Sequence, residues 1–531
     1  MGRVTDPAAP GPQTSTTTAA RGGALNVAGS VVSMALNLVL VVLVAREYGA
    51  AGSGVFFAAV ALFTILGTMV KLGSETGLVF SISRFRARDR WADILPTINI
   101  AFWPVLALAV VVALALMAGA DLLPGHGQHT RDGDFVAVMR GLLPFLPAFV
   151  AVQVLTGATR GYGTMVATVR DISILRPTLQ AGFMAVVVAR GDGLVALAVA
   201  WGLPLAITSF TAAWSLIRLV QADPRGGTPS PGLRREFWAY ASVRGFAQTL
   251  QTTQDRIGVV VVAAVAGPAV AGVFVVVARI IGALNLIVYA VGQAMNPEIS
   301  GLLARHDRAG AERMVQRITA WTMLLVWPMA VLLITHGDVI LSLFGPEFVV
   351  GSSALELLAL AMIVCTAFGH LDNVLLMGGR ARLSLINVGV SLALMVGLYA
   401  VLTPRYGLMG AAWSWAIGLL AYNLGPWPYV RRSLGIQGLG PEALYVVPAT
   451  VGVLVASSFG RVILGDSWPA TLLTFVVSGV VFLLAVRQYA GPLRLAELGG
   501  MLRPLSAEGE SGTTESDITA DGTAMAAEHL T

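Results

Sequence analysis

Four polar side chains on one face of a long apolar segment are the best candidates for binding chemistry in this sequence. They are Arg244, Gln248, Gln251 and Asp255, within the stretch 236–263, which is long enough to cross a bilayer. Their i, i+4, i+7, i+11 spacing keeps them within roughly a 60° arc of a helix. Because such a face is costly against lipid, it predicts contact with the protein interior or with a water-filled cavity.

Two further arginines fall inside apolar segments. Arg176, beside Pro177, lies near the middle of the segment 164–189, where an arginine costs roughly 3 kcal/mol on insertion scales. Arg279 lies about two turns inside the segment 271–296. A buried ion pair with a carboxylate and an anion-binding cavity both fit Arg176. Snorkelling explains Arg244 or Arg279 taken singly, but the three arginines together predict the lining of one cationic cavity.

Other charged residues within the apolar segments have simpler interpretations. Lys71 and Glu75 are spaced i, i+4 and either neutralise each other within a helix or take part in ion coupling. His370 and Asp372 lie near one end of an apolar segment, where solvation at the level of the lipid headgroups is expected.

Enzyme and cofactor chemistry is not indicated. The single cysteine, Cys365, excludes a disulfide framework and a cysteine metal site. Lys71, the one lysine, is followed by leucine, which rules out a phosphate-binding P-loop. The sequence contains no G-x-S-x-G or H-E-x-x-H motif. We therefore expect no enzyme activity, no metal and no cofactor.

The polar spacing recurs earlier in the chain, which predicts an internal repeat. An offset of 218 positions aligns four earlier polar residues, Asn26, Ser30, Ser33 and Asn37, with Arg244, Gln248, Gln251 and Asp255. The same offset aligns Val41, Gly49, Gly54 and Phe56 with Val259, Gly267, Gly272 and Phe274. A duplicated membrane unit with matching polar faces is typical of a transporter whose cavity lies between two related halves.

Composition identifies a polytopic membrane protein. The 531 residues are 56% hydrophobic and 12% charged, with a net charge of +5; a soluble protein carries about 25% charged residues. The basic residues sit mainly in short loops, where they set topology, so the charge does not indicate nucleic-acid binding.

Fourteen spans are expected at 24–45, 55–80, 95–118, 135–158, 164–189, 193–217, 237–263, 271–296, 317–336, 352–377, 383–402, 408–430, 441–463 and 468–488. With both termini cytoplasmic, 23 basic residues fall inside and 5 outside, as the positive-inside rule requires.

The same pattern divides the chain into an all-α arrangement of two six-helix bundles with additions. The expected parts are a disordered cytoplasmic tail (1–22), a first bundle (23–219), a Pro/Gly-rich linker (220–235), a second bundle (236–433), two extra helices (434–489) and an acidic disordered tail (490–531).

Four stretches resemble one family of membrane transporters. They are FWAYASVRGFAQTLQTTQDRIGVVVVAAVAGPAVAGVFVVVARI, LFGPEFVVGSSALELLALAM, LLMGGRARL and LTPRYGLMGAAWSWAIG. In this order they resemble the lipid-linked oligosaccharide flippases of bacterial surface-polysaccharide pathways, within the multidrug, oligosaccharidyl-lipid and polysaccharide exporter (MOP) superfamily. Asp255, Arg256 and Arg279 fall where that family has an acid-base pair and an arginine. Arg244 matches a further arginine, although Val243 replaces a proline often found there.

This resemblance implies a fold like that of MATE transporters, with a central cavity, in the cytoplasmic membrane. It further implies alternating-access export of a polyprenyl-pyrophosphate-linked oligosaccharide, with a polysaccharide polymerase and glycosyltransferases as possible pathway partners. Arginines bind phosphate oxygens bidentately, so Arg176, Arg244 and Arg279 would hold the pyrophosphate. The amide stripes, including Asn26 and Asn37, would bind sugars. A cation-coupled small-molecule antiporter and a peptidoglycan-precursor flippase remain alternatives, as does a non-transporting membrane scaffold.

Overall fold

The protein is built from helices, and the computed structural model describes residues 12–119, 132–223, 228–491 and 493. No strand occurs in these ranges. The helices before the linker are α1 (Pro12–Val70), α2 (Ser74–Arg86), α3 (Ile94–Gly119), α4 (Asp132–Leu142), α5 (Leu146–Gly161), α6 (Val166–Thr168), α7 (Arg176–Arg190) and α8 (Leu194–Gln221). Those after it are α9 (Leu233–Ala266), α10 (Pro268–Ala304), α11 (Arg308–Ser342), α12 (Ser352–Ala367), α13 (Leu371–Met377), α14 (Ala381–Leu424), α15 (Trp427–Leu434), α16 (Val446–Leu464) and α17 (Trp468–Tyr489).

Short helical turns connect several of these elements. They are η1 (Trp91–Asp93), η3 (Leu143–Phe145), the π-helical η4 (Val169–Leu175), η5 (Pro346–Gly351) and η6 (Pro441–Tyr445).

The described helices account for fourteen membrane crossings. Eleven segments are long and apolar enough to span a membrane. Two of them reverse direction at a glycine with positive φ, Gly49 (64°) in α1 and Gly407 (54°) in α14, and so cross twice. A straight α1 of 59 residues would be roughly 90 Å long, three times the ~30 Å hydrocarbon core. The polar α9, 34 residues long, is the remaining crossing. The expected all-α membrane fold is confirmed.

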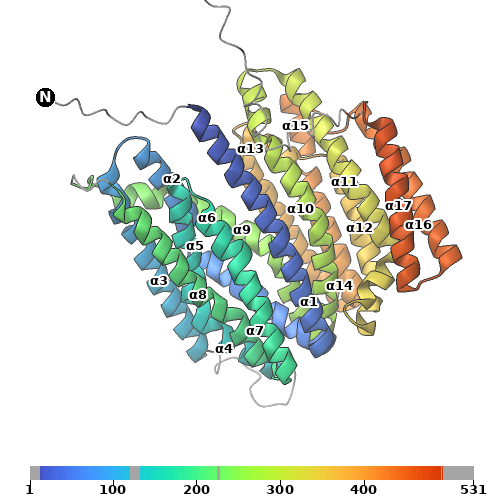
Figure 1. The fold of residues 1–531 in the computed structure, drawn as a ribbon, viewed down its shortest axis with the longest axis horizontal. Helices are drawn as coiled ribbons and strands as arrows, with labels where there is room; N and C mark the ends of the chain where they lie inside the picture. Colours follow the sequence, from blue (N-terminus) through green and yellow to red (C-terminus); the bar gives the residue numbers. More distant parts are fainter. Residues whose placement is uncertain (1–11, 120–131, 224–227, 492, 494–531) are drawn as a thin grey trace, which may run out of the picture.

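Two groups of helices lie side by side (Figure 1). We call α1–α8 the first lobe and α9–α15 the second lobe; each packs mainly within itself, through pairs such as α5 with α8 and α11 with α12. Helix α1 crosses the centre of the molecule against α9 and α10. Helices α16 and α17 pack on α11 at one edge of the second lobe (Figure 1).

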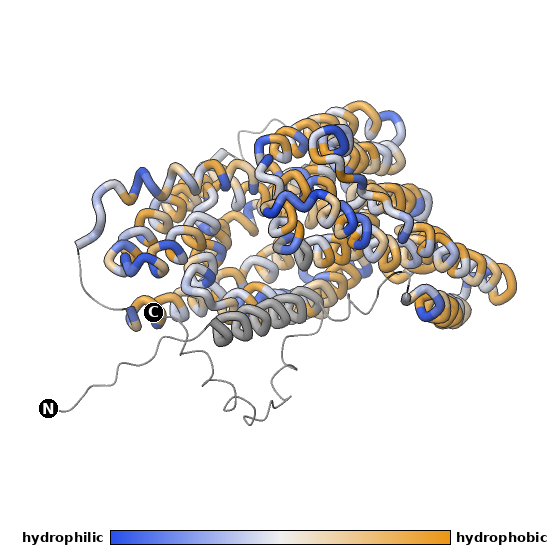
Figure 2. The backbone as a smooth tube through the Cα atoms, turned by 90° about the horizontal axis from the view of Figure 1, so that it is seen from above, coloured by the Kyte–Doolittle hydropathy of each residue, from blue (hydrophilic) through white to orange (hydrophobic). Residues whose placement is uncertain are grey.

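Apolar residues run along most of these helices (Figure 2). Many of them lie on the outer surface, where large side chains such as Phe210 and Val462 are 78% and 83% exposed. A belt of this kind suits contact with lipid acyl chains and accounts for the low charged fraction of the sequence. The molecule is therefore a multi-pass membrane protein.

The lobes meet at a first zone, which we call the distal closure, where α1 turns at Gly49 and α10 begins. The chain at Gly54 packs directly against α10, so that a Cβ there would lie 2.8 Å from the Gly272 amide nitrogen. A Cβ at Gly272 would in turn lie 3.1 Å from the Ala50 Cα. The Ala50 amide donates a hydrogen bond to Glu347 Oε1 at 3.0 Å. At Gly54 and Gly272 the opposing backbone is too close for any side chain larger than hydrogen.

A second zone, the linker closure, lies where α2 packs along the first half of α9. Gly73, with φ of 76°, lies against α9, and a Cβ there would be 2.7 Å from the Gly245 Cα. Arg84 forms an ion pair with Glu236. The rings of Phe80 and Tyr240 stack with centroids 4.2 Å apart. Glycines thus allow backbone contact between the lobes at both ends of the molecule.

The helix boundaries differ from the sequence expectation at three places. Helix α1 begins at Pro12, so the chain is already helical over residues 12–22, where a disordered tail was expected. The linker is shorter than expected, since α8 ends at Gln221 and α9 begins at Leu233. Beyond α17, Leu493 is buried and its carbonyl accepts a 2.8 Å hydrogen bond from Trp321 Nε1. Residues 1–11 and 494–531 of the two expected tails lie outside the described residues.

Candidate binding cavity

A cavity of about 1240 Å³ lies between the two lobes. Its walls come from α1, η4 and α7 of the first lobe and from α9, α10, α11, α13 and α14 of the second, with Phe475 of α17 also contributing. The two closures lie at either end of the helices that line it. A space of this size in the membrane-embedded part of the molecule is the main candidate for a ligand site.

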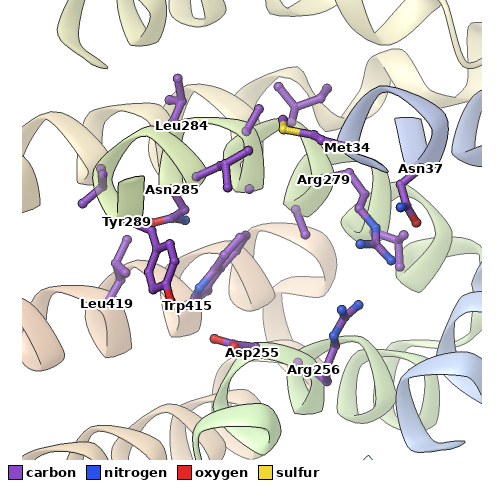
Figure 3. A pocket seen from close by; sticks show the side chains of 18 of the residues that line it. Met34, Asn37, Asp255, Arg256, Arg279, Leu284, Asn285, Tyr289, Trp415 and Leu419 are labelled. Carbon is purple, nitrogen blue, oxygen red and sulfur yellow. The ribbon is translucent and has the colours of Figure 1, made fainter. Parts of the chain in front are cut away.

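Three arginines line this cavity: Arg176, Arg256 and Arg279. Within the described residues none of them has a carboxylate within 4 Å, and the buried Nε of Arg176 has no hydrogen-bond partner there. The Arg279 guanidinium lies 5.9 Å from the centre of the Phe57 ring. Arg256 and Arg279 stand on the same side of the cavity, near Asn37 (Figure 3). The three arginines therefore form a cationic wall whose charge is not neutralised by ion pairs within the described residues.

A local irregularity of the backbone positions Arg176. Pro177 has no amide hydrogen to donate to the preceding turn, and the seven residues up to Leu175 form a π-helix. Wider turns of this kind are frequent at functional sites. The result is that α7 begins with Arg176 at the cavity wall.

The polar stripe of α9 is only partly inside the cavity. Gln251 and Asp255 line it, together with Gln254, but Arg244 and Gln248 do not. Arg244 is exposed near the linker closure, because eleven helical residues carry it roughly 16 Å from Asp255. The expected cationic cavity therefore contains Arg256 in place of Arg244.

The remaining sequence-predicted residues have varied positions. Asn37 lines the cavity and its Nδ2 donates to the Ser33 carbonyl at 2.7 Å, whereas the side chain of Asn26 lies outside the described part of α1. Lys71 and Glu75 are buried in the first lobe, outside the cavity. Their Nζ and Oε2 atoms are 2.5 Å apart, and Arg160 also pairs with Glu75. The i, i+4 pair thus forms one buried charge cluster.

The sequence did not indicate a second polar group on the cavity wall. His370 and Asp372, expected at headgroup level, line the cavity together with Asn285, Tyr289 and Tyr422. The chain breaks before them at Gly369, with φ of 78°. His370 is the N-cap of the short α13 and Asp372 lies in its first turn, and this helix packs beside α10 and α14.

Hydrogen bonds fix this second group. Asp372 Oδ2 accepts from Ser384 Oγ at 2.9 Å and from the Tyr422 hydroxyl at 3.2 Å, and the His370 ring pairs with the Thr322 hydroxyl at 3.1 Å. The carboxylate is thereby held in one orientation. For Asn285 and Tyr289 the sequence did contain a signal. Their i, i+4 spacing, shortly after Arg279, places both side chains on one face of α10.

Positions related by the 218-residue offset face the same cavity. The pairs that both line it are Ser33 with Gln251, Asn37 with Asp255, Leu38 with Arg256, Phe57 with Val275, Val60 with Ala278, and Ala61 with Arg279. The same offset relates the reciprocal contacts of the distal closure, Gly54 near Pro268 and Gly272 near Ala50. The spatial arrangement therefore supports the internal repeat.

Comparison with known proteins shows that this fold occurs in other membrane proteins of known structure. No family model matches the chain. An uncharacterized membrane protein of Methanocaldococcus jannaschii is 22% identical over 202 residues, which are 38% of this chain and 39% of that protein. The structure of the lipid II flippase MurJ in an inward closed conformation superposes with a TM-score of 0.69 at 12% identity, covering 88% of this chain and 98% of that one. An inward-facing MATE family transporter of the MOP superfamily gives 0.63 at 18% identity, covering 76% and 95%. The chain has the fold of these proteins.

Proposed function

We propose that this chain, which has the fold of MurJ and MATE transporters, is a flippase for a polyprenyl-pyrophosphate-linked oligosaccharide. It moves the glycolipid from the inner to the outer leaflet of the cytoplasmic membrane by alternating access, for assembly of a cell-surface polysaccharide. The linker end of the molecule faces the cytoplasm in this proposal, since the arginine-rich run 84–90 and Arg234–Arg235 lie there and basic loops are retained inside.

The unpaired arginine cluster is the observation that carries this proposal. A pyrophosphate is a multivalent anion, and guanidinium groups bind phosphate oxygens through two parallel hydrogen bonds. Arg176, Arg256 and Arg279 converge on one space from three helices. Their cost at membrane depth is offset when an anionic ligand occupies the cavity.

The size and lining of the cavity also suit a glycolipid headgroup. Its volume exceeds the range of roughly 300–1,000 Å³ common for small-molecule sites. Amide and hydroxyl groups, which can bind sugars, line the cavity. The prenyl tail would stay in the lipid bilayer, against the exposed apolar side chains of the outer surface. A cation-coupled antiporter of small molecules would favour an acidic cavity, whereas the lining acids in the described residues are Asp255 and Asp372 against three arginines.

A peptidoglycan lipid precursor is the second candidate substrate. The likeness to the lipid II flippase MurJ favours it, and the same arginines would hold its pyrophosphate. The two substrates differ in the groups attached beyond the phosphates. Deleting the protein and identifying which prenyl-linked intermediate accumulates on the cytoplasmic side separates them.

Substitution of the arginines tests the proposal directly. In proteoliposomes holding a fluorescent polyprenyl-pyrophosphate glycan, Arg176→Ala, Arg256→Ala and Arg279→Ala should each weaken binding roughly tenfold to 150-fold, because a hydrogen bond to a charged group contributes about 1.5–3 kcal/mol. Arg244→Ala is the matched control, since this exposed arginine lies on α9 outside the cavity. Wild-type binding and flipping by all three cavity variants, at normal protein levels, would refute the proposal.

A further inference from the structure

We infer that the cavity contains a separate saccharide subsite, formed by Asn285, Tyr289, Trp415 and Asp372 of the second lobe, apart from the arginine cluster. This inference rests on the proposed function, because it assigns the glycan and the pyrophosphate of one substrate to different ends of the same space. All four residues line the cavity. The prediction from the amide stripes of α1 and α9 placed the sugars elsewhere.

The two ends of the cavity differ in chemistry. Tyr289, Asn285 and Trp415 form one group, whereas Arg279, Arg256 and Asn37 form another on the opposite side (Figure 3). Tyr289 follows Arg279 by ten residues on α10, which is roughly 15 Å along a helix axis. That separation leaves room for a pyrophosphate at one end and sugar units at the other.

The aromatic residues of this subsite present the surface that sugars bind. Tyr289 is 63% exposed, whereas Trp415 is half-buried; both occur in membrane-spanning segments and line the cavity. Aromatic rings combine a large apolar face with a polar edge. The C–H face of a pyranose packs on such a ring, and its hydroxyls then reach neighbouring polar groups. A ligand of this mixed character fits the exposed ring of Tyr289 and the neighbouring ring of Trp415 on the cavity wall.

Asp372 supplies the acceptor that a sugar hydroxyl requires. Its Oδ2 already accepts hydrogen bonds from Ser384 and Tyr422, whereas its buried Oδ1 has no partner among the described residues. A buried acceptor without a donor costs roughly 1–3 kcal/mol, and a ligand hydroxyl at the cavity wall would satisfy it. The amide of Asn285 can both donate and accept, as hydroxyl recognition demands.

A bound cation is the alternative occupant near Asp372. Calcium and magnesium sites draw on several oxygen ligands, with carboxylates among them. In the described part of the chain no three acidic, histidine or cysteine side chains are grouped to hold a metal ion. The hydroxyl groups of Ser384 and Tyr422 both donate to Oδ2 of Asp372, so that oxygen of the carboxylate already has its hydrogen-bond donors. The geometry therefore favours a neutral hydroxyl ligand.

The experiment compares three probes that differ only in their sugars. Purified protein in nanodiscs is titrated with a polyprenyl pyrophosphate that carries no sugar, one sugar, or the full oligosaccharide. In the wild type the sugars should tighten binding. Tyr289→Ala and Asp372→Asn should remove roughly threefold to tenfold of affinity for the glycosylated probes and leave the sugar-free probe unchanged. Arg279→Ala should weaken all three probes equally.

Two controls keep the result interpretable. Tyr406→Ala removes a tyrosine of α14 that is similarly exposed, at 65%, but lies outside the cavity lining, and it should leave all affinities unchanged. Tyr422→Phe removes one hydrogen bond to Asp372 without truncating the aromatic ring, so it tests the carboxylate if Asp372→Asn misfolds.

Equal weakening of sugar-free and glycosylated probes by the subsite variants would overturn the inference. So would a sodium or proton dependence that Asp372→Asn abolishes while sugar discrimination stays intact. Failure of the wild type to bind any of the probes refutes the proposed function itself.

Discussion

Replacement of Gly272 by alanine should open the distal closure. The new Cβ would lie 3.1 Å from the Ala50 Cα and closer still to the Ala50 carbonyl group, and these backbone atoms move only if α1 and α10 separate. Overpacking of this kind costs about 1–3 kcal/mol. Because the contact joins the two lobes, that cost falls on the closed conformation, and the ratio of open to closed molecules should rise roughly fivefold to 150-fold.

Replacement of Gly245 by alanine should act in the opposite direction. Its Cβ would lie 2.5 Å from the Gly73 amide nitrogen, so the linker closure is the one that is destabilised. The two variants add the same methyl group to two glycines that both face the first lobe. A general loss of stability would affect both ends of the molecule alike, whereas weakening of one closure moves the equilibrium toward opening at that end.

Spin labels across the distal end measure this equilibrium. Cys365, the one native cysteine, is replaced by alanine, and labels are attached at Arg190→Cys of the first lobe and Arg405→Cys of the second, both exposed positions. Gly272→Ala should increase the population of long distances in double electron-electron resonance, and Gly245→Ala should not. Gly301→Ala on α10, where a Cβ meets open space, serves as the control. An unchanged distance distribution in Gly272→Ala refutes the claim that this contact holds the lobes together.

Two further predictions concern stability. Glu75→Gln leaves the buried Lys71 beside a neutral partner, so it should destabilise the first lobe by about 3–5 kcal/mol, seen as a lower melting temperature in detergent; an unchanged melting temperature contradicts the assigned cluster. Trp321→Phe removes the hydrogen bond from the indole to the Leu493 carbonyl, at a cost of about 1–3 kcal/mol. Limited proteolysis should then cut faster near Leu493, and cleavage at the wild-type rate argues against this anchor.

The number of crossings could be predicted from the sequence because two independent signals agree. Apolar runs of spanning length and the alternation of arginine-rich loops give fourteen spans, and the structure confirms this all-α membrane fold. Gly49 and Gly407 lie in the short stretches between expected spans, and both adopt positive φ where the chain reverses. Local chemistry therefore decides where helices turn.

The composition of the cavity was less accessible to sequence reasoning. Helical periodicity assigns Arg244 and Asp255 to one face of α9, but it does not say how much of that face lies beside the cavity. That limit is set by the linker closure, where Gly245 packs on Gly73. Likewise, His370 and Asp372 enter the cavity because the chain breaks at Gly369. Both facts depend on contacts between segments that are far apart in the sequence.

The repeat gives the cavity a chemical asymmetry with mechanistic consequences. Asp255, Arg256 and Arg279 of the second lobe are matched in the first lobe by Asn37, Leu38 and Ala61, so most charge lies on one lobe. A ligand can bias a conformational equilibrium only through contacts that differ between the states. Under the proposed function, a headgroup held by Arg256 and Arg279 would keep those contacts while the second lobe moves as a unit.

Arg176 is the cavity arginine contributed by the first lobe among the described residues, and its distance from a headgroup held by the second lobe changes when the lobes move. We therefore expect the loss of Arg176 to lower the transport rate more than the affinity, and the loss of Arg279 to lower both. The arginine variants of the flipping assay distinguish these outcomes, and equal effects of the two variants on rate and affinity would show that the headgroup is shared evenly between the lobes.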